Sequence, residues 1–241
     1  LAASFDTVIA TTEFAAAEFV RIKTTNLRKV ALGVDLQGFK PENRDHKLRK
    51  ELLKGADYLL VHCGRMSPEK EPARSVQAVS ELVKAGVNVR LIIVGGGPLW
   101  NKIRKQSLGL PIEMLGYVAS REKVAGYLAA ADIAIAPGPL ETFCLSALES
   151  LASGTPVVAS KSSAVGEILN INSIRPAGAV ASDNGADFAI AIKQLLNKGR
   201  LRKVAREQAE KFSWANTVDA MLDVHGAKQP MVTTKRRLKV A

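Results

Sequence analysis

Two basic residues, Arg65 and Lys70, stand in a short segment, GRMSPEK, that follows an apolar run at residues 58–63. Gly64 opens this segment, and we expect it to allow an unusual turn at the end of a strand. Two cations at the carboxyl edge of a strand can hold a diphosphate through charge-assisted hydrogen bonds. On spacing alone, however, two solvated charges in a strand-to-helix loop explain the pattern better.

Two acids, Glu141 and Glu149, stand in the segment GPLETFCLSALE with seven residues between them. Thr142 is a candidate cap for a helix that follows. The first amides of that helix would form a site for a phosphate; they are those of Phe143, Cys144 and Leu145. Glu141 precedes the helix and can accept hydrogen bonds from sugar hydroxyls. Glu149 can reach a second polyol such as a ribose, and it needs a partner or a ligand if it is buried. A helix whose acid faces solvent explains Glu149 equally well.

A run of glycines at residues 95–97, followed by Pro98, resembles a phosphate-binding loop only loosely. It has neither the Gly-x-Gly-x-x-Gly spacing nor a following Lys-Ser/Thr, which argues against a dinucleotide cofactor and an NTPase site. We interpret the run as a place where the backbones of two loops approach each other closely.

The elements that must position these residues alternate along the chain. Strands are predicted at residues 58–63, 89–94, 112–115, 133–136, 156–159 and, at a sheet edge, 179–181. Helices are predicted at 75–85, 99–107, 123–130, 145–153, 164–169, 185–197 and 200–211. This alternation predicts an α/β fold with a doubly wound, parallel, Rossmann-like sheet. Ligands of such sheets bind beyond the carboxyl ends of the strands, which points to the loops at 64–70, 95–98, 116–123 and 136–143.

The two ends of the chain do not fit this domain. A strand at 8–11, a helix at 13–21 and a strand at 29–34 predict the closing piece of another sheet, and a polar linker follows at 41–44. We therefore divide the chain into a remnant of an N-terminal domain with its linker (1–40), the Rossmann-like domain (41–212), a helix that crosses back (213–225) and a basic tail (226–241).

The composition of the 241 residues limits the classes of protein that need to be considered. Hydrophobic residues make up 47% and aromatic residues 5%, as suits helices packed on a parallel sheet, and no apolar run is long enough to span a bilayer. Only two cysteines are present and no signal peptide is visible, so we expect a reducing, cytoplasmic location. The chain begins with Leu1 and not with Met, so we expect it to start inside a longer protein.

The net charge of +11 favours anionic partners without choosing among them. Part of the excess lies in the basic tail, at Lys235, Arg236, Arg237 and Lys239. We interpret this tail as a solvated segment. Few aromatic residues accompany the charge and no recognition module is apparent, so we expect no binding of nucleic acid.

In order and spacing, these features resemble the C-terminal, donor-binding domain of the family 4 retaining glycosyltransferases, which have the GT-B fold. The resemblance extends over residues 6–225 and rests on the stretches 31–35, 64–70, 95–99, 115–118, 131–132, 141–149 and 153–158. In the segments 136–143 and 212–214 the sequence is most similar to the actinobacterial GDP-mannose-dependent α-mannosyltransferases of this family.

The resemblance implies a role for each candidate residue. Arg65 and Lys70, next to Gly64, match the pair that grips the donor diphosphate and helps it depart. Glu141 matches the acid that contacts the transferred sugar, and Glu149 the acid that contacts the ribose. The backbone of Phe143, Cys144 and Leu145 matches the segment that touches sugar and phosphate, while Tyr117, Val118 and Lys123 match the region around the base. The family usually has Gly at position 144 and often at 71, where this chain has Cys144 and Glu71.

The resemblance further implies transfer of a hexose, with mannose favoured, from a nucleoside diphosphate sugar to a lipid or glycan acceptor. The family retains the anomeric configuration and needs neither a cofactor nor a metal. Its acceptor loops belong to the N-terminal domain, most of which this sequence lacks, so we expect the chain alone to transfer little. A UDP-sugar donor and a non-catalytic nucleotide-sugar sensor or scaffold are alternatives. Peripheral contact with an anionic membrane, at the inner face of the plasma membrane, would suit a basic enzyme of glycolipid biosynthesis.

Overall fold

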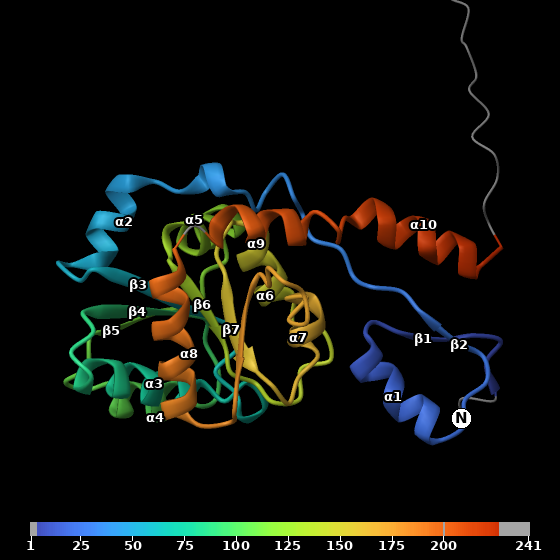
Figure 1. The fold of residues 1–241 in the computed structure, drawn as a ribbon, viewed down its shortest axis with the longest axis horizontal. Helices are drawn as coiled ribbons and strands as arrows, with labels where there is room; N and C mark the ends of the chain where they lie inside the picture. Colours follow the sequence, from blue (N-terminus) through green and yellow to red (C-terminus); the bar gives the residue numbers. More distant parts are fainter. Residues whose placement is uncertain (1–3, 200, 227–241) are drawn as a thin grey trace, which may run out of the picture.

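The computed structural model describes residues 4–199 and 201–226, and within them the strands form two parallel sheets. The small sheet consists of β1 (Val8–Ala10) and β2 (Leu27–Lys29). The large sheet has six strands in the order β5 (Ile112–Gly116), β4 (Val89–Val94), β3 (Tyr58–Cys63), β6 (Ile133–Ala136), β7 (Val157–Ser160) and β8 (Gly178–Ala181). The predicted α/β fold with a doubly wound parallel sheet is confirmed (Figure 1).

Helices cover both faces of the large sheet. One face carries α3 (Pro72–Lys84), α4 (Trp100–Gln106) and α8 (Gly185–Lys198). The other face carries α2 (His46–Leu53), α5 (Arg121–Ala130), α6 (Leu145–Ala152), α7 (Val165–Ile168) and α9 (Leu201–Ala209). Two short 3-10 turns, η2 (Pro41–Asn43) and η3 (Pro68–Lys70), precede α2 and α3, and α1 (Glu13–Arg21) and α10 (Trp214–Val224) lie outside the large sheet. Strands buried on both faces explain the near-continuous apolar runs in the sequence.

The strand order changes direction between β3 and β6, which are paired at the centre of the large sheet. From β3 the chain continues outward through β4 to β5, and from β6 it continues outward through β7 to β8. The loops that leave β3 and β6 therefore diverge, and a crevice is expected at the carboxyl ends of these two strands.

Two predictions about the N-terminal segments were wrong. The strand expected at 29–34 is β2, at Leu27–Lys29, and the chain after it is extended until Val34 forms an isolated parallel bridge with Ser213. Gly33 passes so close to the start of α10 that an added Cβ would lie 2.5 Å from the Cα of Trp214. After one more hydrogen bond to β1, from the Val30 amide to the Ala10 carbonyl, the segment thus pairs with the start of α10 and not with a sheet.

The linker expected at 41–44 is also more regular than predicted. It holds η2, and α2 follows directly, with the Asp45 side chain accepting hydrogen bonds from the amides of Lys47 and Leu48. Leu48 and Leu52 lie four residues apart on α2 and pack on the core. The signal for this helix was therefore present in the sequence as a capping Asp followed by two leucines on one face.

A smaller lobe formed by α1, β1, β2 and α10 lies beside the large domain (Figure 1). Within it, the Thr217 hydroxyl of α10 donates to the carbonyl of Ala31 at 2.9 Å. The basic tail, predicted as a solvated segment, begins at residue 226, and its residues 227–241 lie outside the described residues.

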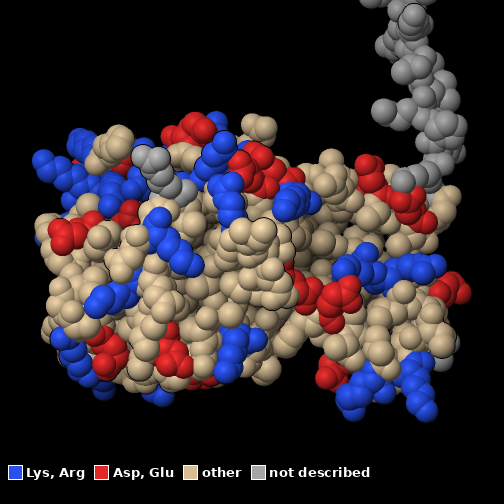
Figure 2. Space-filling model, in the orientation of Figure 1, with Lys and Arg blue, Asp and Glu red and all other residues tan. Residues whose placement is uncertain are grey.

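Basic side chains are spread over the face of the molecule that Figure 2 shows. Figure 2 shows Lys and Arg gathered over α2, at the upper left, and again near the end of α1, at the lower right. In the part of the chain that is described, no helix has both the length and the apolar character that crossing a membrane requires.

Candidate functional site

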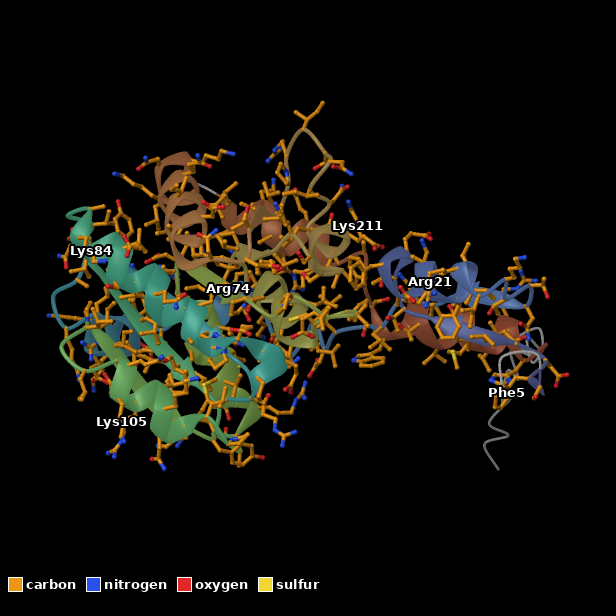
Figure 3. All side chains as sticks on the ribbon, turned by 90° about the horizontal axis from the view of Figure 1, so that it is seen from below. Phe5, Arg21, Arg74, Lys84, Lys105 and Lys211 are labelled. Carbon is orange, nitrogen blue, oxygen red and sulfur yellow. The ribbon has the colours of Figure 1, made fainter. Side chains whose placement is uncertain are left out.

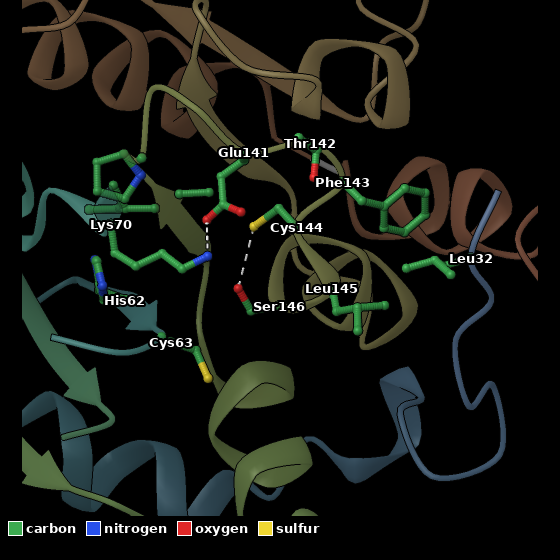
Figure 4. Close-up of a pocket in the computed structure, with 15 residues that line it drawn as sticks. Leu32, His62, Cys63, Lys70, Glu141, Thr142, Phe143, Cys144, Leu145 and Ser146 are labelled. Atoms are coloured by element: carbon green, nitrogen blue, oxygen red, sulfur yellow. Dashed lines mark hydrogen bonds and ion pairs between the residues drawn. The ribbon is translucent and has the colours of Figure 1, made fainter. Parts of the chain in front are cut away.

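A cavity of about 400 Å³ opens at the carboxyl ends of β3 and β6, where the strand order changes direction. Its lining comprises Leu32, His62, Cys63, Gly64, Lys70, Ile135, Ala136, Pro137, Gly138, Glu141, Thr142, Phe143, Cys144, Leu145 and Ser146 (Figure 4). Six of the residues predicted from the sequence are among them: Gly64, Lys70, Glu141, Phe143, Cys144 and Leu145.

Lys70 and Glu141 point toward one another inside this cavity (Figure 4). The ammonium Nζ of Lys70 lies 2.5 Å from Oε1 of Glu141, and the side chains are 33% and 13% exposed. Gly138 lets the two loops approach, because a Cβ at that position would lie 2.9 Å from the carbonyl oxygen of Glu69 and 3.3 Å from Glu141. The pair offers a cation to an incoming anion and a carboxylate to hydroxyl groups.

The start of α6 differs from the prediction. The helix begins at Leu145, and its N-cap is Cys144, whose side chain makes no capping hydrogen bond. Thr142 is therefore not the cap. Its carbonyl instead accepts hydrogen bonds from the hydroxyls of Thr11 and Thr12 in the smaller lobe. The amides in the first turn, which have no acceptor within their own helix, include those of Leu145 and Ser146 rather than that of Phe143.

Cys144 has a left-handed backbone, with φ at 70°. This conformation favours glycine, because a side chain there crowds the following carbonyl. Burial raises the pKa of the Cys144 thiol to about 11 and that of Cys63 to about 12, aided by the negative charges of Glu141 and Glu149 respectively. Both thiols are therefore protonated near neutral pH and are poor nucleophiles. Among the described residues, no three His, Cys, Asp or Glu side chains are grouped to hold a metal ion.

Glu149 is largely buried on α6 but does not line the cavity. Burial raises the pKa of its carboxyl group; Arg121 opposes the rise and Asp35 adds to it. Arg121 is the first residue of α5 and lies 3.7 Å from Glu149, with its guanidinium 5.1 Å from the centre of the Phe39 ring. The partner that a buried Glu149 was expected to need is therefore Arg121.

The remaining predicted residues lie outside the cavity lining. The Arg65 side chain is exposed, directly after Gly64. Tyr117 is 81% exposed and lies beside Gly96, and Val118 packs against the core. Lys123 lines a separate cavity of about 500 Å³ between α2 and α5. The structure thus brings together the residues expected at sugar and phosphate more closely than those expected at the base.

The glycine run after β4 holds the loop after β3 in place. An added Cβ on Gly95 would overlap the carbonyl oxygen of Gly64, and one on Gly97 would lie 2.6 Å from that of Met66. The predicted close approach of two loop backbones is confirmed. Gly64 itself has no positive φ, so the unusual turn expected there is wrong; a Cβ at Gly64 would meet only the Nε2 atom of His62, at 3.7 Å.

Two buried residues at the site were missed by the sequence interpretation. His62 is 2% exposed; burial and the charge of Lys70 lower its pKa to about 4. Its signal was a single imidazole within an otherwise apolar strand. Arg74 of α3 lies inside the molecule (Figure 3), where it donates to the carbonyl of Pro137 and pairs with Asp183 at 3.2 Å. Arg74 thereby fixes the loop that leads from β6 to Glu141.

The sequence is similar to those of known glycosyl transferases. The sequence model of the family "Glycosyl transferases group 1" matches residues 43–212. The chain is 45% identical over 228 residues to the GDP-mannose-dependent alpha-(1-6)-phosphatidylinositol dimannoside mannosyltransferase of Mycobacterium tuberculosis, covering 94% of this chain and 59% of that protein. It is 30% identical to the D-inositol 3-phosphate glycosyltransferase of Saccharomonospora viridis, covering 92% and 56%. The chain thus spans less than two thirds of the length of these relatives.

Solved structures show the same fold at lower identity. The sucrose-phosphate synthase of Thermosynechococcus elongatus superimposes with a TM-score of 0.78 at 24% identity, over 92% of this chain and 58% of that one. Anabaena HepE in complex with UDP-glucose superimposes with a TM-score of 0.79 at 20% identity, over 92% and 64%.

Proposed function

This chain belongs to the group 1 glycosyl transferases, and on that premise we propose that it is the donor-binding part of a retaining hexosyltransferase. The observation that carries the proposal is the cavity at the carboxyl ends of β3 and β6, which is lined by Lys70, Glu141 and the first turn of α6. A cation and helix amides favour a diphosphate, and a carboxylate beside them favours sugar hydroxyls.

In the proposed complex, the diphosphate lies against Lys70 and the amides at the start of α6, with Arg65 reaching it from the rim. Glu141 accepts hydrogen bonds from the sugar. Glu149 binds the ribose, and Tyr117, Val118 and Lys123 surround the base. Lys70, Arg65 and the helix amides supply the positive charge that stabilises the departing diphosphate, so the proposal requires no metal.

In the proposed reaction, the bond between sugar C1 and the diphosphate oxygen breaks, and its electron pair stays on that oxygen. The acceptor hydroxyl forms the new bond to C1 on the same face of the sugar, and its proton passes to the departing phosphate. Lys70 stabilises the charge that develops on the leaving group, and this stabilisation is larger in the transition state than in the ground state. No protein nucleophile is needed, in keeping with the protonated thiols of Cys63 and Cys144.

We favour GDP-mannose as the donor and a lipid or glycan as the acceptor. The mycobacterial relative that is 45% identical is named as a GDP-mannose-dependent mannosyltransferase acting on a phosphatidylinositol dimannoside. A UDP-sugar is the alternative donor. The positive charge of the chain supports peripheral contact with an anionic membrane at the inner face of the plasma membrane.

The diphosphate contact is tested by Lys70→Ala. We expect the variant to bind GDP at least about ten-fold more weakly than the wild type, because a charge-assisted contact is lost, while guanosine binds both equally. Titration calorimetry measures both affinities. Lys84→Ala, which removes an equally charged side chain at the far end of α3, is the control and leaves both affinities unchanged. Equal GDP affinity in wild type and Lys70→Ala would refute the proposed diphosphate site.

The donor is identified by comparing GDP-mannose, GDP, UDP-glucose and UDP as ligands that raise the melting temperature of the chain. A larger shift with the guanine nucleotides supports the preferred donor, and a larger shift with the uridine nucleotides supports the alternative. The sensor or scaffold alternative predicts binding of the donor without transfer when the chain is joined to a complete acceptor domain.

A further inference from the structure

His62 is a buried titratable residue that lines the cavity and has no part in the proposed reaction. It lies on β3 between apolar neighbours, on the same side of the sheet as Leu60 and α3. Its Nδ1 atom lies 2.9 Å from the hydroxyl oxygen of Ser75 on α3, and that hydroxyl is fully buried. An imidazole in this position is fixed by α3 on one side and borders the cavity on the other.

The contact with Ser75 assigns the ring hydrogen. A buried hydroxyl needs an acceptor for its hydrogen. Within the described part of the chain, the Ser75 hydroxyl has a single hydrogen-bond partner, Nδ1 of His62. The hydroxyl therefore donates to Nδ1, and a neutral ring then carries its hydrogen on Nε2.

The Nε2 atom lies toward the carboxyl end of β3. A Cβ added to Gly64, directly after the strand, would lie 3.7 Å from Nε2 and, apart from its chain neighbours Cys63 and Arg65, would meet no other atom within 4 Å. Since Gly64 has no side chain, none covers Nε2 from that position, and His62 is among the residues that line the cavity. Figure 4 shows His62 on the same side of the cavity as Lys70. An uncharged donor thus lies beside the ammonium group that the diphosphate would contact.

We propose that His62 is a direct ligand of the donor's diphosphate, donating a hydrogen bond from Nε2–H, with its tautomer fixed by Ser75. This inference rests on the proposed function, because it assumes that the anion in the cavity is a diphosphate. A neutral donor adds a hydrogen bond to a phosphate oxygen without placing a second buried charge next to Lys70. Gly64, in turn, leaves the space through which the phosphate oxygen approaches the ring.

The tautomer is tested first, by NMR of the imidazole nitrogens in the complete chain at neutral pH. We expect a neutral His62 ring with its proton on Nε2, and a change in the Nε2–H signal on addition of GDP. In Ser75→Ala, we expect the fixed tautomer to be lost. A proton on Nδ1, or a charged ring, in the wild-type chain without nucleotide would overturn the inference.

The contact is tested by calorimetry with GDP and guanosine. His62→Phe keeps a ring of similar size but removes the hydrogen-bond donor. We expect GDP to bind this variant about ten-fold more weakly, because a hydrogen bond to a charged group contributes more than one between neutral groups. Guanosine affinity should not change. His62→Gln, whose amide also donates, should recover part of the GDP affinity, and Ser75→Ala should lose part of it. A structural defect would instead weaken both ligands together.

The outcomes separate this inference from the proposed function. If wild-type protein binds no nucleoside diphosphate, the proposed function fails. If the wild type binds GDP and His62→Phe binds it equally well, the function stands and the role of His62 is refuted. If circular dichroism shows that His62→Phe does not fold, Ser75→Ala is used in its place, because it retains the imidazole. Unchanged GDP affinity and an unchanged tautomer in Ser75→Ala would then refute the inference.

Discussion

Lys70, Glu141 and His62 lie around one cavity, where the first two form an ion pair and the third is a neutral ring. Lys70 and Glu141 compensate each other as an ion pair. His62 has no carboxylate partner among the described residues, and burial together with the charge of Lys70 keeps it neutral. These three side chains therefore carry no net charge in the free protein. A bound diphosphate would draw the ammonium away from Glu141 and leave that carboxylate free for sugar hydroxyls.

The low pKa of His62 predicts how stability depends on pH. Above pH 6.5 the ring is neutral in both the folded and the unfolded chain. As the pH falls from 6.5 to about 4, the unfolded chain binds a proton that the folded chain does not, so the free energy of unfolding decreases. The decrease amounts to about 3 kcal/mol at about 1.4 kcal/mol per pH unit.

Urea unfolding at a series of pH values between 4 and 7 measures this effect against a His62→Phe variant. We expect the stability difference between the two proteins to shift in favour of the variant as the pH falls. The other titrating groups, including Glu149 with its raised pKa, are present in both proteins and cancel. A stability difference that stays constant across this range would show that His62 titrates normally.

At the scale of elements, the turn between η3 and α3 depends on a residue in an unfavourable conformation. Glu71 is left-handed, with φ at 46°, and its amide and carbonyl are both hydrogen-bonded in the turn, to Pro68 and Arg74. A glycine there would relieve the steric cost of a side chain, which is about 1–2 kcal/mol, at a smaller cost in backbone entropy. We expect Glu71→Gly to raise the free energy of unfolding by about 1 kcal/mol, as measured by denaturant unfolding.

Glu81→Gly is the matched control for the turn. Glu81 lies within α3, where the backbone is helical and glycine is unfavourable by about 1 kcal/mol. The same substitution should therefore have opposite effects at the two positions. Destabilisation by both variants would mean that the Glu71 side chain contributes more than its conformation costs.

Most elements of the large domain were predictable because their apolar runs and helical faces are unambiguous. The strands at 58–63, 89–94 and 133–136 have the predicted bounds, and so does the helix at 13–21 in the smaller lobe. The strand expected at 29–34 was misplaced because its apolar residues pair with the start of α10, a contact between segments far apart in the sequence. Periodicity carries no information about such a partner.

The cavity was predictable in outline from the rule that ligands bind at the carboxyl ends of parallel strands. Its details were not. The start of α6 depends on the left-handed backbone at Cys144, which residue type argues against. The His62 ring at the cavity is oriented by Ser75 on α3. Gly64 contributes to the site through the space that its missing side chain leaves and not through an unusual φ. Each of these depends on tertiary contacts.

At the scale of the whole molecule, the smaller lobe contacts the loop that carries the site. The hydroxyls of Thr11 and Thr12 donate to the carbonyl of Thr142, one residue after Glu141. Glu167 of α7 accepts the amides of Glu13 and Phe14, at 2.8 Å and 2.7 Å, and so caps α1 from the other domain. A carboxylate at a helix N-terminus also interacts favourably with the helix dipole. The position of α1 is thereby linked to the loop around Glu141.

Glu167→Ala tests this link between the lobes. Without the carboxylate, the first two amides of α1 lose their acceptor, and we expect them to exchange with solvent about ten-fold faster, which corresponds to about 1.4 kcal/mol. Hydrogen exchange read by NMR at Glu13 and Phe14 measures the change. The Ala15 amide, which donates a hydrogen bond to the Thr12 hydroxyl within the lobe, should exchange at its original rate. The effect should therefore be confined to the amides that Glu167 accepts.

Glu18→Ala removes the same charge from the exposed face of α1, where Glu18 pairs with Arg21, and is the control for net charge. It should leave the exchange of the Glu13 and Phe14 amides unchanged. If Glu167→Ala also leaves them unchanged, the carboxylate does not hold the lobes together in solution. If instead all amides of α1 exchange faster in Glu167→Ala, the helix itself depends on the large domain, because a helix of this length gains most of its stability from packing. The contact between Thr12 and Thr142 would then share that role.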